Sequence, residues 1–158
     1  MRRQTDYIIN LSLIKLIMNS IKKLIEQHNS MTIATSGNQG SAAAAVFYAP
    51  SEDNRTLIFV SNSKSEHIKN SVVNPNCAAT IHKDEMNWEE IRGLQIKGKI
   101  EPAEKEHWEV YFKKFPYIKQ NENLMRALEK VNLYAFKIKW IRIIDNTRGF
   151  GAKEEFTY

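Results

Sequence analysis

Short turns separate the strand-like stretches of this chain, and their spacing limits the folds that it can adopt. Residues 31–35 and 42–49 have the composition of two strands, and residues 36–40 (SGNQG) between them are typical of a hairpin turn. Further strand-like stretches lie at 56–61, 77–82, 90–101 and 133–144. Strands joined by short turns pair antiparallel, whereas parallel strands need a long crossover. The chain is therefore predicted to form an antiparallel barrel or sandwich rather than a doubly wound parallel sheet.

Four segments with helical spacing accompany these strands. The first has one apolar face, made of Ile14, Ile17, Met18, Ile21, Leu24 and Ile25. We predict an amphipathic helix packed on the domain, with a helix lying on a membrane surface as the alternative. Shorter helices are predicted at 63–73, 103–115 and 121–130. The third helix has an aromatic stripe typical of a packed face, and the fourth is predicted to turn Leu124, Met125 and Leu128 inward.

Length and charge limit the classes of partner. The chain has 158 residues, which is the size of one domain. It carries 23 Lys and Arg against 18 Asp and Glu, a formal net charge of +5, without a run of basic residues. Such a charge does not require nucleic acid and suits a small anionic ligand equally well. No stretch approaches the roughly eighteen apolar residues of a membrane-spanning helix. We therefore expect no nucleic-acid partner and no membrane.

The single cysteine, Cys77, lies in the strand-like stretch CAATI and is expected to be a buried thiol. One cysteine forms no intramolecular disulfide, which suits a reducing cytosol, so a cytoplasmic protein is expected. It also excludes zinc motifs that need two cysteines, and no other metal-binding cluster stands out. We expect no metal.

Hydroxyl and cationic side chains gather where a predicted strand meets a predicted helix, in residues 60–75 (VSNSKSEHIKNSVVNP). Ser63 and Glu66 have the spacing of a capping box, in which each side chain bonds the other's backbone N–H. Free N–H groups at a helix start also attract anions, and serine hydroxyls and lysine add donors and charge. The segment is thus predicted to be a helix cap, a phosphate cradle, or both.

Four consecutive alanines, residues 42–45, are unusual in a strand because alanine has a low strand propensity. Small side chains let a flat, bulky group lie against the backbone. Close packing of one sheet on another would explain them equally well, and the sequence does not separate these two interpretations.

Three motifs in order carry a family resemblance. The strand entering S-N-S-K-S-E-H-I-K-N is followed by R-G-L-Q-I-K-G-K-I-E and, near the end, by D-N-T-R-G-F-G. Residues 19–153 thereby resemble the FMN-binding split-barrel proteins related to pyridoxamine 5'-phosphate oxidase, and the last motif resembles a small, poorly characterised branch of them. The resemblance implies a mainly β fold, an antiparallel split β-barrel of six or seven strands with an N-terminal helix and inserted helices. It divides the chain into a helical extension, 1–18, and one domain, 19–158.

The resemblance also implies FMN at a homodimer interface. Residues that would contact the isoalloxazine ring or the ribityl chain are Ala44, Ala45, Val46, Phe47, Val60 and Ser61. Those that would face the phosphate are Lys64, Ser65 and His67. The family's Arg-Lys pair at the phosphate falls on Glu66 and His67.

Two further parts of the chain belong to the implied site. Gln95 lies on a strand that faces the flavin in the family. Asn146 and Arg148, in the D-N-T-R-G-F-G motif, are expected to form a lid or dimer contact over the site, or else a structural C-terminal turn. The glycines of this motif indicate a turn with positive φ.

The function expected from the resemblance is that of an FMN-dependent oxidoreductase of unknown substrate, with no residue assigned as acid or base. Pyridoxamine-phosphate oxidase activity itself is not expected, because the substrate-binding signature near the C-terminus is absent. The alternative is a non-catalytic flavin-binding or haem-binding stress protein, with His67 or His82 as candidate haem ligands.

Overall fold

The computed structural model describes residues 2–84 and 87–158, with side chains from residue 11 onward. The helices are α1 (Arg2–Gln27), α2 (Glu66–Val73), α3 (His107–Lys114) and α4 (Glu122–Leu128). The strands are β1 (Ser30–Gly37), β2 (Gly40–Pro50), β3 (Thr56–Ser61), β4 (Asn76–His82), β5 (Arg92–Pro102), β6 (Asn132–Asp145) and β7 (Lys153–Thr157). Three short 3₁₀ turns are η1 (Trp88–Glu90), η2 (Pro116–Gln120) and η3 (Asn146–Arg148).

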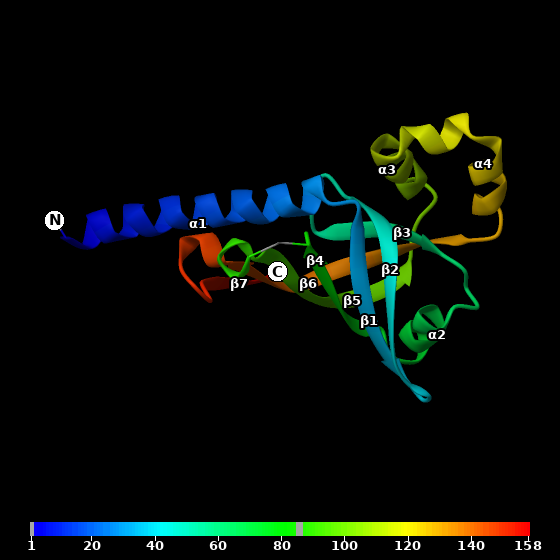
Figure 1. Ribbon diagram of the computed structural model, residues 1–158, viewed down its shortest axis with the longest axis horizontal. Coiled ribbons are helices and arrows are strands. Elements are labelled where there is room, and N and C mark those ends of the chain that lie inside the picture. The colour runs from blue at the N-terminus through cyan, green and yellow to red at the C-terminus, as the bar shows by residue number, and fades with distance from the viewer. Residues whose placement is uncertain (1, 85–86) are drawn as a thin grey trace.

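The strands form one antiparallel sheet that closes on itself. Their order is β3-β2-β1-β4-β5-β6-β7, and an additional pairing of β3 with β6 closes six of them into a barrel. β7 pairs with β6 outside this closure. The predicted antiparallel split barrel with peripheral helices is confirmed (Figure 1). Closure leaves few free strand edges, which stabilises a small β-domain.

Side chains at alternate positions of the strands point inward and fill the barrel. Leu57, Phe59, Ile81, Phe136 and Ile141 are completely buried within it. A second cluster lies outside the barrel, where α3 packs on β2 and β3 through Tyr111 and Phe115. The aromatic stripe predicted to be a packed face is therefore confirmed at its buried members. Leu124 and Met125 of α4 are exposed, so the prediction that they face inward is wrong for the single chain.

Helix α1 covers one end of the barrel and runs past it toward the N-terminus (Figure 1). Ile17, Ile21, Leu24 and Ile25 are buried against the barrel, which confirms the predicted amphipathic packing for these residues, whereas Ile14 of the predicted face is exposed. The helix is continuous across residue 18, and the domain boundary placed there stays a prediction. Within the described residues, no helix combines the length and the apolar character needed to cross a membrane.

A buried hydrogen bond fixes α1 to the barrel. The Tyr48 hydroxyl donates to the carbonyl oxygen of Ile25 over 2.6 Å, and Tyr48 is completely buried. We expect Tyr48→Phe to lower the free energy of unfolding by about 1–2 kcal/mol, because the Ile25 carbonyl would lose its buried donor. Urea denaturation measures the difference. Tyr117→Phe, at an exposed tyrosine, is the control and should change stability little. Equal effects of both changes would contradict a role for this bond.

The start of α2 differs from the prediction. The helix begins at Glu66, Ser65 is its N-cap without a side-chain capping bond, and the predicted Ser63–Glu66 capping box is wrong. The physical reason lies at Asn62. Its side-chain oxygen accepts from the Lys64 N–H and its carbonyl accepts from the Ser65 N–H, so a turn precedes the helix.

A bulge interrupts the pairing of β5 with β6. Lys97 pairs with Trp140, but the next residue, Gly98, pairs with Ile138, so Lys139 is an extra residue on β6. Glycine inside a strand often accompanies a bulge or a close backbone approach, and both occur at Gly98. Two consecutive side chains, Lys139 and Trp140, consequently lie outside the barrel while Ile138 and Ile141 are buried.

Candidate functional site

The outer face of the barrel carries a flat area of small side chains. Thr32 and Ala34 of β1 pair with Ala45 and Ala43 of β2 on one side and with Thr80 and Ala78 of β4 on the other. All six side chains are exposed, because strand alternation turns their larger neighbours, such as Ile33 and Ile81, into the core. We call these six residues the small-residue floor. A flat ligand can approach the backbone closely here.

Larger polar groups border the floor on the β5 and β6 side. Thr80 pairs with Gln95, and Gln95 pairs with Arg142. The Arg142 guanidinium donates to the Gln95 side-chain oxygen over 3.1 Å and to Glu155 over 2.6 Å. The hydrogen bonds from Arg142 lower the pKa of the Glu155 carboxyl, which keeps this carboxylate charged. The floor thus ends in an amide and a guanidinium held in place by a carboxylate.

The predicted ring-contacting residues of β2 divide between the two faces. Ala45 belongs to the floor, and Phe47 continues its line with an exposed fraction of 56%. Ala44 and Val46 pack against the core instead, so they can offer only backbone atoms to a ligand on the outside. The Phe47 ring lies 5.8 Å from that of Phe115 and borders the floor with an aromatic side chain.

The predicted phosphate-facing residues lie at the junction of β3 and α2. Ser61 is buried, and its hydroxyl forms a hydrogen bond of 2.8 Å with Nε2 of His67. Val60, just before it, packs on the second apolar cluster. Lys64 is exposed and Ser65 half-buried at the helix start. The structure therefore brings these residues together, but two of them are already bonded to each other.

Burial lowers the pKa of the His67 imidazole. Between that lowered pKa and the ordinary histidine value of about 6.5, the unfolded chain binds more protons than the folded one. Stability therefore rises with pH through this window and falls on acidification. We expect His67→Gln, whose side chain cannot be protonated, to lose less stability than the unchanged protein between about pH 7.5 and pH 5. Urea unfolding at both values tests this, with His82→Gln as the control, and an unchanged pH dependence would contradict it.

The C-terminal motif forms a tight turn away from that junction. The Asn146 side chain donates to the Trp88 carbonyl over 2.6 Å and accepts from the Gly151 N–H, while Arg148 pairs with Glu154 at 3.7 Å. Gly149 and Gly151 have positive φ, as their sequence predicted. Figure 1 shows this turn at the α1 end of the barrel, whereas α2 lies at the other end. Within one chain, Asn146 and Arg148 do not meet Ser61 or His67, and a lid or dimer contact stays a prediction.

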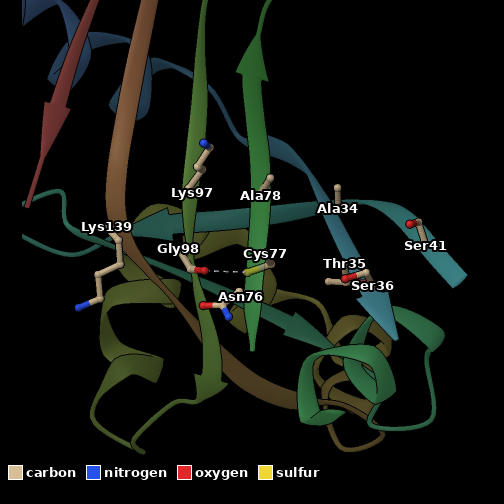
Figure 2. A pocket seen from close by; sticks show the side chains of 10 residues that line it. All are labelled: Ala34, Thr35, Ser36, Ser41, Asn76, Cys77, Ala78, Lys97, Gly98 and Lys139. Atoms are coloured by element: carbon tan, nitrogen blue, oxygen red, sulfur yellow. Dashed lines mark hydrogen bonds between the residues drawn. The ribbon is translucent and has the colours of Figure 1, made fainter. Parts of the chain in front are cut away.

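A cavity of about 500 Å³, which was not predicted from the sequence, lies beside the floor. Ten residues from five strands line it: Ala34, Thr35, Ser36, Ser41, Asn76, Cys77, Ala78, Lys97, Gly98 and Lys139 (Figure 2). We call it the lysine pocket. It contains none of the predicted site residues, although Ala34 and Ala78 are shared with the floor. Alternation with Gln95 places Lys97 on the outside, but no sequence signal pointed to Lys139. No group of three or more potential metal ligands occurs among the described residues.

Comparisons with known proteins agree with this architecture. The sequence profile of the pyridoxamine 5'-phosphate oxidase family matches residues 17–145. A UPF0306 protein of Campylobacter jejuni is 29% identical over 136 residues, which cover 86% of this chain and 95% of the relative.

Two solved structures share the fold at low sequence identity. Campylobacter jejuni ChuZ superposes with a TM-score of 0.75 and 16% identity over 90% of this chain, which spans only 60% of the length of ChuZ. HutZ, the haem storage protein of Vibrio cholerae, has a TM-score of 0.61 and 15% identity, covering 88% of this chain and 92% of HutZ. Because the family profile covers most of the chain and the split barrel is present, the protein belongs to the pyridoxamine 5'-phosphate oxidase family.

Proposed function

We propose that the protein binds FMN on the small-residue floor, between two copies of the chain, and acts as a flavin-dependent oxidoreductase. The floor itself is the observation that supports this most. Six small, exposed side chains lie in register on three neighbouring strands, and polar groups of Gln95 and Arg142 follow at the border. A flat ring could stack on such a surface while its heteroatoms meet the amide and the guanidinium.

The residues around the floor fit a flavin well at the ring and less well at the predicted phosphate position. Small side chains leave room for the ring, and Phe47 offers an aromatic border. At the α2 junction, Lys64 and the half-buried Ser65 can contact the phosphate, but the carboxylate of Glu66 follows them directly. When bound, FMN supplies the electron transfer, and the chain contributes binding and orientation.

A homodimer would cover the exposed floor. The floor and Phe47 together leave apolar surface open to solvent in the single chain, and a second copy is the occupant that the family resemblance implies. Light scattering after gel filtration should give twice the chain mass of 18.4 kDa. A monomer at all concentrations would contradict this part of the proposal.

The visible spectrum of the purified protein tests the cofactor. We expect added FMN to give a shifted, protein-bound flavin spectrum, and reduction of that flavin by NADH or NADPH without oxygen would support catalysis. No spectral shift on adding FMN would overturn flavin binding. A bound flavin that neither nucleotide reduces would favour a carrier over an enzyme.

Haem binding is the second candidate. His82 is exposed beside a cavity of about 350 Å³ that also contacts Gly93 and Gln95. Its Nδ1 lies 3.2 Å from the Lys83 carbonyl, which leaves Nε2 available for a metal. The likeness to HutZ supports this candidate at the level of the fold. A Soret band that His82→Ala removes would favour haem over FMN.

A further inference from the structure

We propose that the lysine pocket, and not the start of α2, receives the anionic group of the bound cofactor, with Lys97 and Lys139 as its cations. This inference rests on the proposed function. The shared chemistry is a flat aromatic cofactor with an anionic arm, which is the phosphate of FMN or the propionates of haem.

The start of α2 is poorly equipped for a dianion. Glu66 places a carboxylate in the first turn of the helix. The lowered pKa of His67 leaves its imidazole neutral near pH 7, and its Nε2 is engaged with Ser61. Lys64 is then the cation that remains at the helix start, two positions before the Glu66 carboxylate.

The lysine pocket, in contrast, is lined by positive and neutral groups. Its ten lining residues include two lysines and no carboxylate. Lys97 and Lys139 come from adjacent strands, and the bulge is what turns Lys139 to the outside next to Lys97. The Lys97 ammonium lies 4.7 Å from the centre of the Trp140 ring, a contact that orients it without neutralising its charge. Among the described residues, Lys139 has no ion pair.

Neutral donors face the lysines from the other side of the pocket. Figure 2 shows Ser36 and Ser41 on β1 and β2, across β4 from the two lysines. The Ser36 oxygen accepts from the Asn74 side chain over 3.1 Å, so its own hydrogen is free to donate to an anion. Burial raises the pKa of the Cys77 thiol to about 12, which keeps this lining group uncharged.

The pocket and the floor form one continuous surface. Ala34 and Ala78 belong to both, and Lys97 pairs directly with Ala78. Neighbouring strands are about 4.8 Å apart, and Lys97 and Lys139 lie on the first and second strands beyond β4, the edge of the floor. A ligand can therefore keep its rings on the floor while its anionic arm enters the pocket, without crossing the sheet.

Paired ligands that differ only in the anionic arm test this placement. FMN is compared with riboflavin, and haemin with its dimethyl ester, by absorbance and fluorescence titration of the full chain. For Lys97→Gln/Lys139→Gln we expect a loss of FMN affinity on the order of 100-fold, because two charge-assisted hydrogen bonds disappear, and little change for riboflavin. If haem is the ligand, haemin should weaken in the same way and its ester should not.

Single variants and controls make the outcome specific. Lys139→Gln alone, which keeps the contact of Lys97 with Trp140, should weaken the anionic ligand about tenfold. Lys113→Gln removes the same charge from exposed α3 and should have no effect. Ser65→Asp should lower FMN and riboflavin affinity alike, whereas the phosphate placement predicted from the sequence requires a far larger loss for FMN.

The results that would overturn the lysine pocket differ from those that would overturn the proposed function. Binding of FMN with unchanged affinity by the double lysine variant, or a selective loss of FMN in Ser65→Asp, would overturn the lysine pocket and leave the proposed function standing. If the unchanged protein binds neither flavin nor porphyrin, the proposed function fails and this inference fails with it.

Discussion

Ala78→Trp is expected to abolish cofactor binding while the barrel keeps its stability. Ala78 lies at the β4 edge of the floor, between Ala34 and Lys97, and its methyl group is exposed. An indole there would occupy the space above the sheet in which a flat ring could stack, and it would also narrow the lysine pocket. Because the side chain leaves the barrel core untouched, the free energy of unfolding should change by about 0.5 kcal/mol or less.

Titration of Ala78→Trp with FMN and with haemin measures the effect, which we expect to exceed about 100-fold in affinity for the ligand that the protein binds. Ala127→Trp on α4, also exposed, adds the same indole away from the floor and should bind normally. Full binding by Ala78→Trp would place the cofactor elsewhere. A loss confined to dimer formation, with cofactor still bound, would show that the floor is an interface and not a ring site.

The strands could be predicted from sequence because their signals are local. Strand-like composition at 31–35 and 77–82, together with the turn residues that separate such stretches, predicted each of these strands. The floor was not predictable in the same way, because it arises only when β1 pairs with β4, across β2, β3 and α2 in the chain. Periodicity shows which residues of a strand share a face, but it does not show which strands become neighbours.

The candidate site likewise combines features that follow from local sequence with features that depend on the tertiary structure. Hydroxyl and cationic side chains were predicted to gather at the strand-to-helix junction, but the hydrogen bond between Ser61 and His67, which were assigned to different parts of the ligand, was not. The capping box was not correct, because the Asn62 side chain competes for the backbone N–H of Lys64. The outward position of Lys139 was not predicted, because a regular strand would turn it to the face opposite Trp140. Only the bulge places both side chains outside the barrel. β7 was not predicted, because its segment is short and charged and has few residues that favour a strand.

Gly98→Ala is expected to be the most destabilising single-methyl change on β5. A Cβ at residue 98 would overlap the carbonyl oxygen of Lys137 and lie 2.5 Å from Cε1 of Phe136. Neither neighbour can move freely, because one is backbone and the other is a completely buried ring. We expect a loss of about 3 kcal/mol in the free energy of unfolding, the upper part of the usual range for overpacking, measured by urea denaturation.

Gly93→Ala provides the matched comparison on the same strand. Its Cβ would lie 2.9 Å from the His82 Cβ and 3.0 Å from the Ile81 carbonyl, a milder conflict at the exposed end of the sheet, so its loss should be clearly smaller. Equal losses would mean that the Gly98 position is no tighter than an ordinary strand glycine. Gly98 faces Ile138 across the bulge that exposes Lys139. A folded Gly98→Ala protein must therefore shift β6 at this point, and we expect it to lose FMN affinity relative to riboflavin, as the lysine variants do.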